Sequence, residues 1–390
     1  MAAIVVAVHF EEVRSVPVSF AAWCETVSVA ERCKVLELFA HTLFDARSGR
    51  AEIENCEAAL LMLARDPSPR VRATLSERIA GEPTAPRAVV QILAGDVDSV
   101  ALPLVCQSRV LCEDDLADLA VTGSLAIRNA LAGRRRIGAR ITAILARDEE
   151  TVVVFRLLAN PSALIAPATL ARIAGNRGGD PEVRELLLQR EDLPAPLRHT
   201  LMLRAGEALA SMDLVRGLLG GAASMRICAE ACEAATGTLA ADLAPEALAD
   251  FVTHLRASGQ VTTAFLLRAA CTGNVDVFAA CVAHLCDRPY RRVRAVLVEA
   301  SEPAFGALCA SAGIPAAARP LLLDAVRAWK DVARRGEERG TRTTLDVLDR
   351  LTGSIGTGVL AEELRTLVVR LGAQARRQYA GESAPLRLVA

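Results

Sequence analysis

Residues 93–119 read LAGDVDSVALPLVCQSRVLCEDDLADL and form one period of a recurring helical pattern. Gly95 is typical of a residue that ends a helix, and Asp96 or Asp98 can cap the next one, because a short carboxylate accepts hydrogen bonds from the free amides at a helix start. The acidic residues 113–115 favour the positive end of a further helix dipole. Each helix is too short to be stable alone in water, so neighbouring helices must cover its apolar face.

The opening of this stretch, an apolar residue followed by Ala, recurs on both sides of it at steps of 26 to 30 residues. An Asp stands two positions after the Ala in three of the five copies, an order that chance recurrence in an Ala- and Leu-rich chain does not explain. The steps are shorter than the roughly 40 residues of a HEAT repeat, so each copy predicts a pair of short helices. The copies begin at Leu63, Leu93, Leu119, Leu145 and Ile173, and lead into Val71 and Leu75, Val100 and Leu104, Ile127 and Leu131, Val152 and Leu157, and Val183 and Leu187.

The composition of the chain agrees with a helical fold. Of its 390 residues, 52% are hydrophobic but only 3% are aromatic, so the core must be built from Ala, Leu and Val. Helical spacing of apolar residues is found almost throughout, and strand-like alternation almost nowhere. The predicted fold class is all-α: a HEAT-like α-solenoid of short helix pairs followed by a second helical domain.

The chain is predicted to divide where this pattern changes, first at Leu193-Pro194-Ala195-Pro196. A stripe of leucines near the C-terminus, between Leu360 and Leu371, either contacts a partner or closes the domain's own core. Gly353–Gly358 is predicted to be a linker, since no strand precedes it and no phosphate-loop Lys follows. The predicted parts are an N-terminal arm (1–18), a HEAT-like repeat domain (19–192), a second helical domain (193–335), C-terminal helices (336–380) and a disordered tail (381–390).

Charge and cysteine usage indicate a cytoplasmic protein. The formal net charge is −1, which demands no polyanionic partner. The eleven cysteines are scattered through apolar helical runs, which is typical of reduced, buried thiols rather than disulfides. The N-terminus lacks a basic leader, and no run of about 18 apolar residues occurs, so neither a signal peptide nor a membrane span is predicted.

Four stretches carry a resemblance to a known family: 93–119, 157–171, 180–194 and 271–315. In these the chain resembles an uncharacterised family of HEAT-like-repeat proteins found mainly in alphaproteobacteria. The resemblance implies an α-solenoid with an appended helical domain, and it implies no activity. The chain departs from the family pattern at Cys112, where a Ser, Thr or Asp cap is usual, and in the strongly basic run 134–136.

Two arginine clusters are the candidate partner or phosphate contacts. The first can meet a phosphate backbone or an acidic partner, or it is a solvated turn balanced by the acidic residues 148–150. The second surrounds Tyr290 and can stack on and pair with a nucleotide, or it is the exposed side of an amphipathic helix. The clusters are Arg134, Arg135, Arg136 and Arg140, and Arg288, Arg291, Arg292 and Arg294.

Metal-ligating and catalytic residue types are present but not in the spacing that their chemistry needs. Cys271, Cys281, His284 and Cys286 lack the paired CxxC knuckles of a zinc site, and Cys228 and Cys232 lie one helical turn apart in an apolar run, so we interpret them mainly as core thiols. No catalytic triad or HExxH motif is evident in the spacing of the five histidines, which are His9, His41, His199, His254 and His284. The sequence therefore predicts no cofactor, no metal and no catalytic residue.

The sequence thus favours a non-enzymatic scaffold or regulatory protein that binds a protein partner on a helical-repeat surface. The alternative is a nucleic-acid-binding HEAT-like protein that uses the arginine clusters, against which stand the net charge and the few aromatic residues. A third hypothesis is an enzyme, such as a lyase or glycosylase, on a helical-repeat frame.

Overall fold

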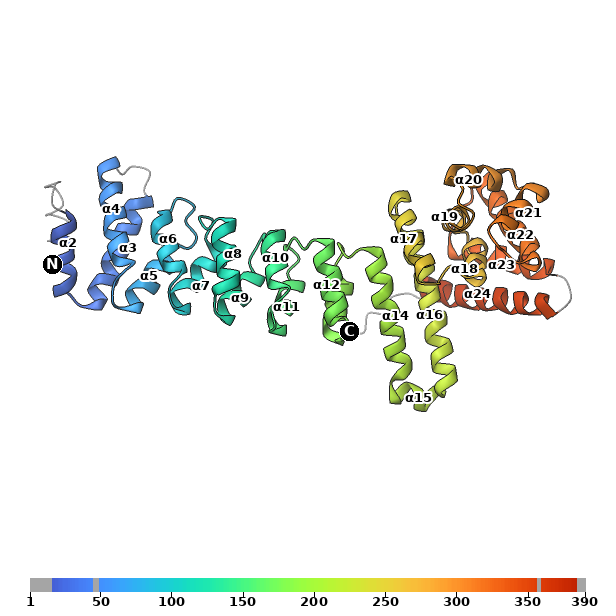
Figure 1. Ribbon diagram of the computed structural model, residues 1–390, viewed down its shortest axis with the longest axis horizontal. Coiled ribbons are helices and arrows are strands. Elements are labelled where there is room, and N and C mark those ends of the chain that lie inside the picture. Colours follow the sequence, from blue (N-terminus) through green and yellow to red (C-terminus); the bar gives the residue numbers. More distant parts are fainter. Residues whose placement is uncertain (1–15, 45–48, 356–358, 384–390) are drawn as a thin grey trace. The chain divides into compact units, whose positions relative to one another are not determined.

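The computed structural model describes residues 16–44, 49–355 and 359–383, and within these ranges it contains 23 α-helices, one short 3-10 helix and no strand (Figure 1). The predicted all-α class is therefore confirmed. The chain divides into two compact units, Met1–Leu193 and Pro194–Ala390, which we describe separately as the N-terminal and C-terminal units.

The N-terminal unit contains twelve described helices, most of them of two or three turns. They are α2 (Val16–Thr26), α3 (Val29–Phe44), α4 (Arg50–Leu63), α5 (Pro69–Ile79), α6 (Arg87–Ala94), α7 (Asp98–Gln107), α8 (Glu113–Thr122), α9 (Leu125–Ala132), α10 (Ala139–Leu145), α11 (Thr151–Leu158), α12 (Pro167–Arg177) and α13 (Pro181–Gln189).

Alternate helices of this unit pack against one another. Contacts run from α3 to α5 and on through α7, α9, α11 and α13, while α4 packs on α6 and α8 on α10 (Figure 1). The predicted apolar pairs occupy the third and seventh positions of α5, α7, α9 and α13, and all of their members are buried. In α11 the prediction is wrong by one residue: Val153, four residues before Leu157, is buried, while Val152 is 47% exposed.

The Asp of the recurring motif holds an arginine from a preceding helix. The ion pairs are Asp66 with Arg32 (2.8 Å), Asp96 with Arg72 (2.5 Å) and Asp148 with Arg128 (2.6 Å). Asp96 also accepts a hydrogen bond from the Val97 amide, but Val97 rather than Asp96 or Asp98 is the N-cap of α7, so the predicted cap is wrong. Cys112 does cap α8, with Asp115 accepting from its amide at 2.9 Å.

The C-terminal unit has longer helices around one hydrophobic core. They are α14 (Ala195–Ser211), α15 (Asp213–Leu219), α16 (Gly221–Ala241), α17 (Pro245–Ala257), α18 (Thr263–Cys271), α19 (Val275–Leu285), α20 (Tyr290–Glu299), α21 (Glu302–Ser311), η2 (Ala316–Ala318), α22 (Arg319–Arg334), α23 (Thr341–Ser354) and α24 (Val359–Ser383).

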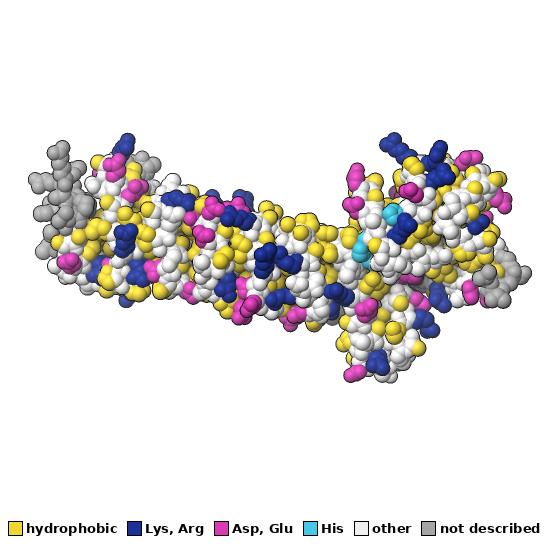
Figure 2. Space-filling view, in the orientation of Figure 1, with side chains coloured by type: hydrophobic (Ala, Val, Ile, Leu, Met, Phe, Trp, Pro, Cys, Tyr) yellow, Lys and Arg dark blue, Asp and Glu magenta, His cyan; other side chains and the backbone are white. Residues whose placement is uncertain are grey.

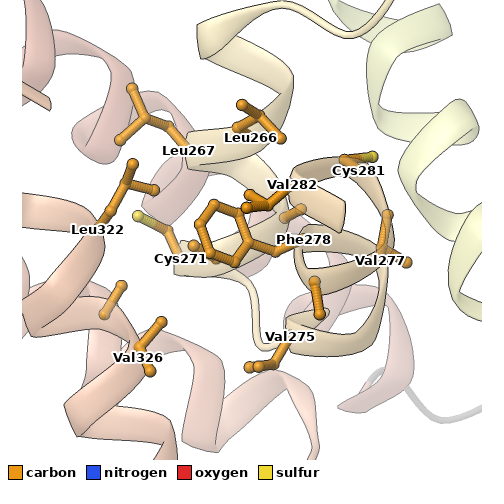
Figure 3. Close-up of a cluster of buried hydrophobic side chains, with 14 of the residues drawn as sticks. Leu266, Leu267, Cys271, Val275, Val277, Phe278, Cys281, Val282, Leu322 and Val326 are labelled. Atoms are coloured by element: carbon orange, nitrogen blue, oxygen red, sulfur yellow. The ribbon is translucent and has the colours of Figure 1, made fainter. Parts of the chain in front are cut away.

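This core surrounds the Phe278 ring of α19, against which side chains of α18 and α22 gather (Figure 3). Trp329 of α22 is buried, and its indole N–H donates to the Cys271 carbonyl at 3.2 Å. Gly273 has a φ of +85°, and a Cβ there would lie 2.9 Å from the Trp329 ring, so the turn requires glycine. Val368 and Leu371 of α24 are also buried in this core, which supports the second of the two predictions for the leucine stripe.

The ends of the predicted segments differ in small ways from the structure. Helix α2 begins at Val16, inside the predicted N-terminal arm, and α24 continues to Ser383, inside the predicted tail. Helix α23 runs through Ser354, so the predicted glycine-rich linker is wrong for its first two residues. Residues 1–15, 356–358 and 384–390 of these segments lie outside the described residues.

Candidate functional site

The first arginine cluster is only partly available to a partner. The guanidinium of Arg134 donates to the carbonyls of Leu104, Val105 and Ser108, which end α7, and burial lowers the pKa of this side chain. These bonds satisfy carbonyls that the end of a helix leaves without partners. Arg134 therefore ties α9 to α7 inside the N-terminal unit.

The other three arginines of this cluster are exposed. Arg140 forms an exposed 2.5 Å ion pair with Asp114, which replaces the predicted balance by residues 148–150. Of those acids, Asp148 instead holds Arg128. Arg135 and Arg136 remain on the surface, the latter with a φ of 56° in a tight turn.

The position of Arg134 belongs to a series that the sequence analysis missed. Asn160, two residues after the end of α11, donates to the carbonyls of Ala132 and Arg134. Arg190, directly after α13, donates to those of Leu158, Asn160 and Ala163. The series consists of two arginines and an asparagine, so no single residue type marks it in the sequence. Its members link the ends of alternate helices in the N-terminal unit.

The second cluster is brought together around Asp276. The Tyr290 hydroxyl donates to Asp276 Oδ1 at 2.8 Å, and Arg294 Nε lies 3.2 Å from the same oxygen. Burial, followed by the hydrogen bond to Asp276, raises the pKa of Tyr290 to about 12. Arg291 and Arg292 are exposed on the same helix.

A cavity of about 660 Å³ opens beside this cluster, between α16, α17, α19 and α20. Arg288, Tyr290 and His284 line it together with three aspartates and an apolar wall that includes Leu248 and Val252. The structure thus places Arg288 at a cavity, and Arg294 reaches it only through the ion pair with the lining residue Asp276. Arg291 and Arg292 do not line the cavity.

Two of the candidate metal ligands, Cys271 and Cys281, are core residues, whereas His284, Cys286, Cys228 and Cys232 are only partly buried. Cys271 and Cys281 are fully buried, and burial raises the pKa of each to about 12. The Cys286 thiol donates to the Val282 carbonyl at 2.9 Å, and Cys232 packs against Gly206. Among the described residues, no group of three or more His, Cys, Asp or Glu side chains is arranged to hold a metal ion.

Two histidines that lie 55 residues apart meet inside the C-terminal unit. His199 Nδ1 of α14 lies 3.1 Å from His254 Nε2 of α17, and His199 is fully buried. Burial, with a smaller contribution from His254, lowers the pKa of His199 to about 4, and burial also lowers that of His254. No local sequence signal predicts such a pair, because its partners come from separate helices.

Seven of the exposed large apolar side chains of the described residues lie on the hairpin formed by α14, α15 and α16, where Figure 2 shows apolar atoms at the surface in yellow. Helix α15 packs mainly on α14 and α16 and has no buried residue. This hairpin lies in the predicted second helical domain, but its exposure could not be predicted because α15 is apolar on several faces. We name as the hairpin surface the seven side chains exposed by 46–77%: Leu209, Met212, Leu214, Leu218, Leu219, Met225 and Ile227.

A groove of about 790 Å³ adjoins the hairpin surface and shares Met225 with it. Small residues, including Gly206 and Ala210, lie along the groove, and Glu207, Arg216 and Arg226 contribute both signs of charge. The arrangement offers apolar contact with a charged rim. None of the described helices is long and apolar enough to cross a membrane.

Comparison with known proteins adds a family to this geometry. A family model described as "Uncharacterised protein conserved in bacteria (DUF2336)" matches residues 100–361, about two thirds of the chain. Comparisons with curated proteins and with solved structures found no match. The chain therefore belongs to this uncharacterised bacterial family, whose match covers much of the N-terminal unit and most of the C-terminal one.

Proposed function

We propose that the protein is a non-enzymatic, cytoplasmic interaction protein that binds another protein through the hairpin surface. The observation that carries this proposal is the exposure of seven large apolar side chains within residues 209–227. Scattered exposed apolar residues are normal on a soluble protein, but a contiguous group of them marks an interaction site.

The groove beside the hairpin surface supports a protein as the partner. Its small side chains allow the backbone of a bound helix to approach closely, and apolar anchors at helical spacing are the usual way in which a helix fills such a groove. Glu207, Arg216 and Arg226 on its rim can set the orientation of the partner.

We further propose that the N-terminal unit is a HEAT-like α-solenoid of the kind found in alphaproteobacterial proteins. Support comes from the successive packing of alternate helices and from the Asp–Arg pairs that recur with the sequence motif.

The experiment is partner capture with tagged full-length protein in a bacterial host of the family, crosslinked and identified by mass spectrometry. The hairpin variant carries Leu214→Asp and Leu218→Asp, and the control carries Leu164→Asp, an equally exposed leucine of the N-terminal unit. A partner that survives nuclease, is lost in the hairpin variant and is retained in the control is expected. Equal capture by both variants, or partners that vanish with nuclease, would contradict the proposal.

A further inference from the structure

We infer that the hairpin surface binds a second copy of this chain, so that α14 and α16 of two molecules form a four-helix bundle. The inference rests on the proposed function, because it names the protein that the hairpin surface binds. Three observations carry it: the placement of large and small side chains on the hairpin, the area that the large ones expose, and the balance of charges around them.

The hairpin buries small residues and exposes large ones. After Leu201 the buried residues of α14 are Gly206 and Ala210, and the first buried residue of α16 is Ser224, whose hydroxyl donates to the Ala210 carbonyl at 3.2 Å. The large apolar side chains of the hairpin surface are instead exposed, up to 77% at Leu218. Two helices that pack through small side chains leave their large apolar side chains uncovered, and the burial of such side chains drives association.

The exposed area is of the size that a dimer needs. The seven residues of the hairpin surface leave on the order of 700 Å² accessible, and a stable interface buries about 800 Å² on each partner. Helix α15, at the tip of the hairpin, packs mainly on α14 and α16 (Figure 1). An interface of this size is expected to have a dissociation constant in the micromolar range.

The hairpin carries both the protruding and the receiving part of a two-fold contact. Leu214 and Leu218 are the most exposed side chains of the hairpin surface and lie outside the groove of about 790 Å³. Gly206, Ala210 and Ala229 line this groove and leave room in it because they are small. A dimer with two-fold symmetry uses the same surface on both molecules, so leucines of each copy fill the groove of the other.

The charges of the groove favour a copy of the chain over a strongly charged partner. Three carboxylates and three guanidinium groups line it: Glu207, Glu230, Glu233, Arg216, Arg226 and Arg370. Arg370 pairs with Glu230 at 3.0 Å, whereas Glu207, Arg216 and Arg226 form no ion pair within the described part of the chain. A surface that presents unpaired groups of both signs can meet the opposite signs on its own copy, which gives charge complementarity without a net charge.

The test is sedimentation velocity on the full chain, from submicromolar concentration to about 100 µM. The expected result is a monomer at the lowest concentration and, at the highest, a species with twice the 41.3 kDa of one chain.

Two pairs of variants locate the interface. Leu214→Asp with Leu218→Asp should weaken self-association by about a hundredfold or more, because charges replace apolar anchors, while Leu164→Asp, an equally exposed leucine of the N-terminal unit, should not. Ala229→Trp fills the groove and should weaken self-association about tenfold, while Ala257→Trp, at an exposed alanine of α17 outside the groove, should not.

Melting temperatures separate association from folding. They are compared at submicromolar concentration, at which the wild-type protein is also a monomer, because dimer formation itself raises the melting temperature. Equal values show that a substitution acts on association, and if one variant melts at a lower temperature, the other pair decides.

Three results would overturn the inference. They are a monomer at every concentration, a dimer that the hairpin variants leave intact, and equal weakening by the control variants. A monomeric chain that still captures a different protein through the hairpin surface in the crosslinking experiment would overturn this inference and leave the proposed function standing. A monomeric chain that captures nothing would overturn both.

Discussion

The guanidinium of Arg72 lies 2.5 Å from the carboxylate of Asp96, although 24 residues separate them in sequence. The same guanidinium donates to the carbonyl of Asp66. The side chains of Arg72 and Asp96 are both about 85% buried. The hydrogen bond from Arg72 is the main cause that holds the pKa of Asp96 below its usual value. One side chain thus connects the ends of two successive helix pairs.

Loss of this carboxylate should destabilise the N-terminal unit. Asp96→Ala leaves the Arg72 charge largely buried without its partner, so we expect the free energy of unfolding to fall by about 2–4 kcal/mol. Asp114→Ala, which removes the acid of an equally short but exposed pair with Arg140, should change it by less than about 0.5 kcal/mol. Urea denaturation measures both, and equal losses would show that burial does not set the strength of these pairs.

Arg134 should behave as a structural residue and not as a partner contact. Arg134→Met keeps the apolar stem but leaves three carbonyls without their donor, which should lower the free energy of unfolding by about 1–3 kcal/mol. Arg135→Ala, which changes the exposed neighbouring residue, should lower the free energy of unfolding by less than about 0.5 kcal/mol. An unchanged free energy of unfolding in Arg134→Met would show that Arg134 is not a structural residue and would restore it as a candidate partner contact.

Two glycines of the hairpin should respond in opposite directions to alanine. A Cβ at Gly206 would lie 2.4 Å from Cys232 Sγ, which should force α14 and α16 apart and cost about 1–3 kcal/mol. At Gly217 no atom lies within 4 Å, so Gly217→Ala should raise stability by up to about 1 kcal/mol through helix propensity. Thermal unfolding compares the two, and matching melting temperatures would contradict this packing of the hairpin.

The histidine pair should make the C-terminal unit less stable as the pH falls. The pKa of His199 is about 4 in the fold and about 6.5 when unfolded, so the unfolded chain binds the proton first and unfolding becomes easier below pH 6.5. Between pH 7 and pH 5 the contribution of His199 amounts to about 2 kcal/mol. His199→Gln should lose this part of the pH dependence in denaturant titrations, and an unchanged slope would exclude His199 as its source.

Polar substitutions in the hairpin surface should not destabilise the fold. Leu218 is 77% exposed, so Leu214→Asp with Leu218→Asp should leave the melting temperature at submicromolar concentration unchanged and reduce binding of a dye that reports exposed apolar surface. Leu201→Ala, on the buried face of α14, should cost about 2–5 kcal/mol instead. Destabilisation by the double variant would mean that these leucines support the fold itself.

The helices and most of their buried faces could be predicted from sequence, because an apolar pair such as Val71 and Leu75 repeats at a spacing that a short helix alone explains. The error at Val152 arose because α11 carries three consecutive valines, among which composition cannot select the buried one. Periodicity also cannot show that Arg134 turns inward toward carbonyls, since an arginine run looks the same whether it is solvated or bonded.

The candidate sites were harder to predict because they depend on contacts between distant segments. Gly206 and Arg370 line one groove although more than 160 residues separate them along the chain. His199 and His254 meet for the same reason. The hairpin surface was missed because an apolar helix is normally read as a core helix, and only the arrangement of its neighbours reveals that α15 is uncovered.

The place of Trp329 in the core has a practical consequence for spectroscopy. The chain has two tryptophans, Trp23 in the N-terminal unit and Trp329 in the C-terminal unit. Trp23→Phe therefore leaves Trp329 of the C-terminal unit as the single fluorescent tryptophan, and Trp329→Phe leaves Trp23 of the N-terminal unit. The fluorescence of these two variants in the same denaturant titration would show whether the two units unfold in one cooperative transition or in two separate ones.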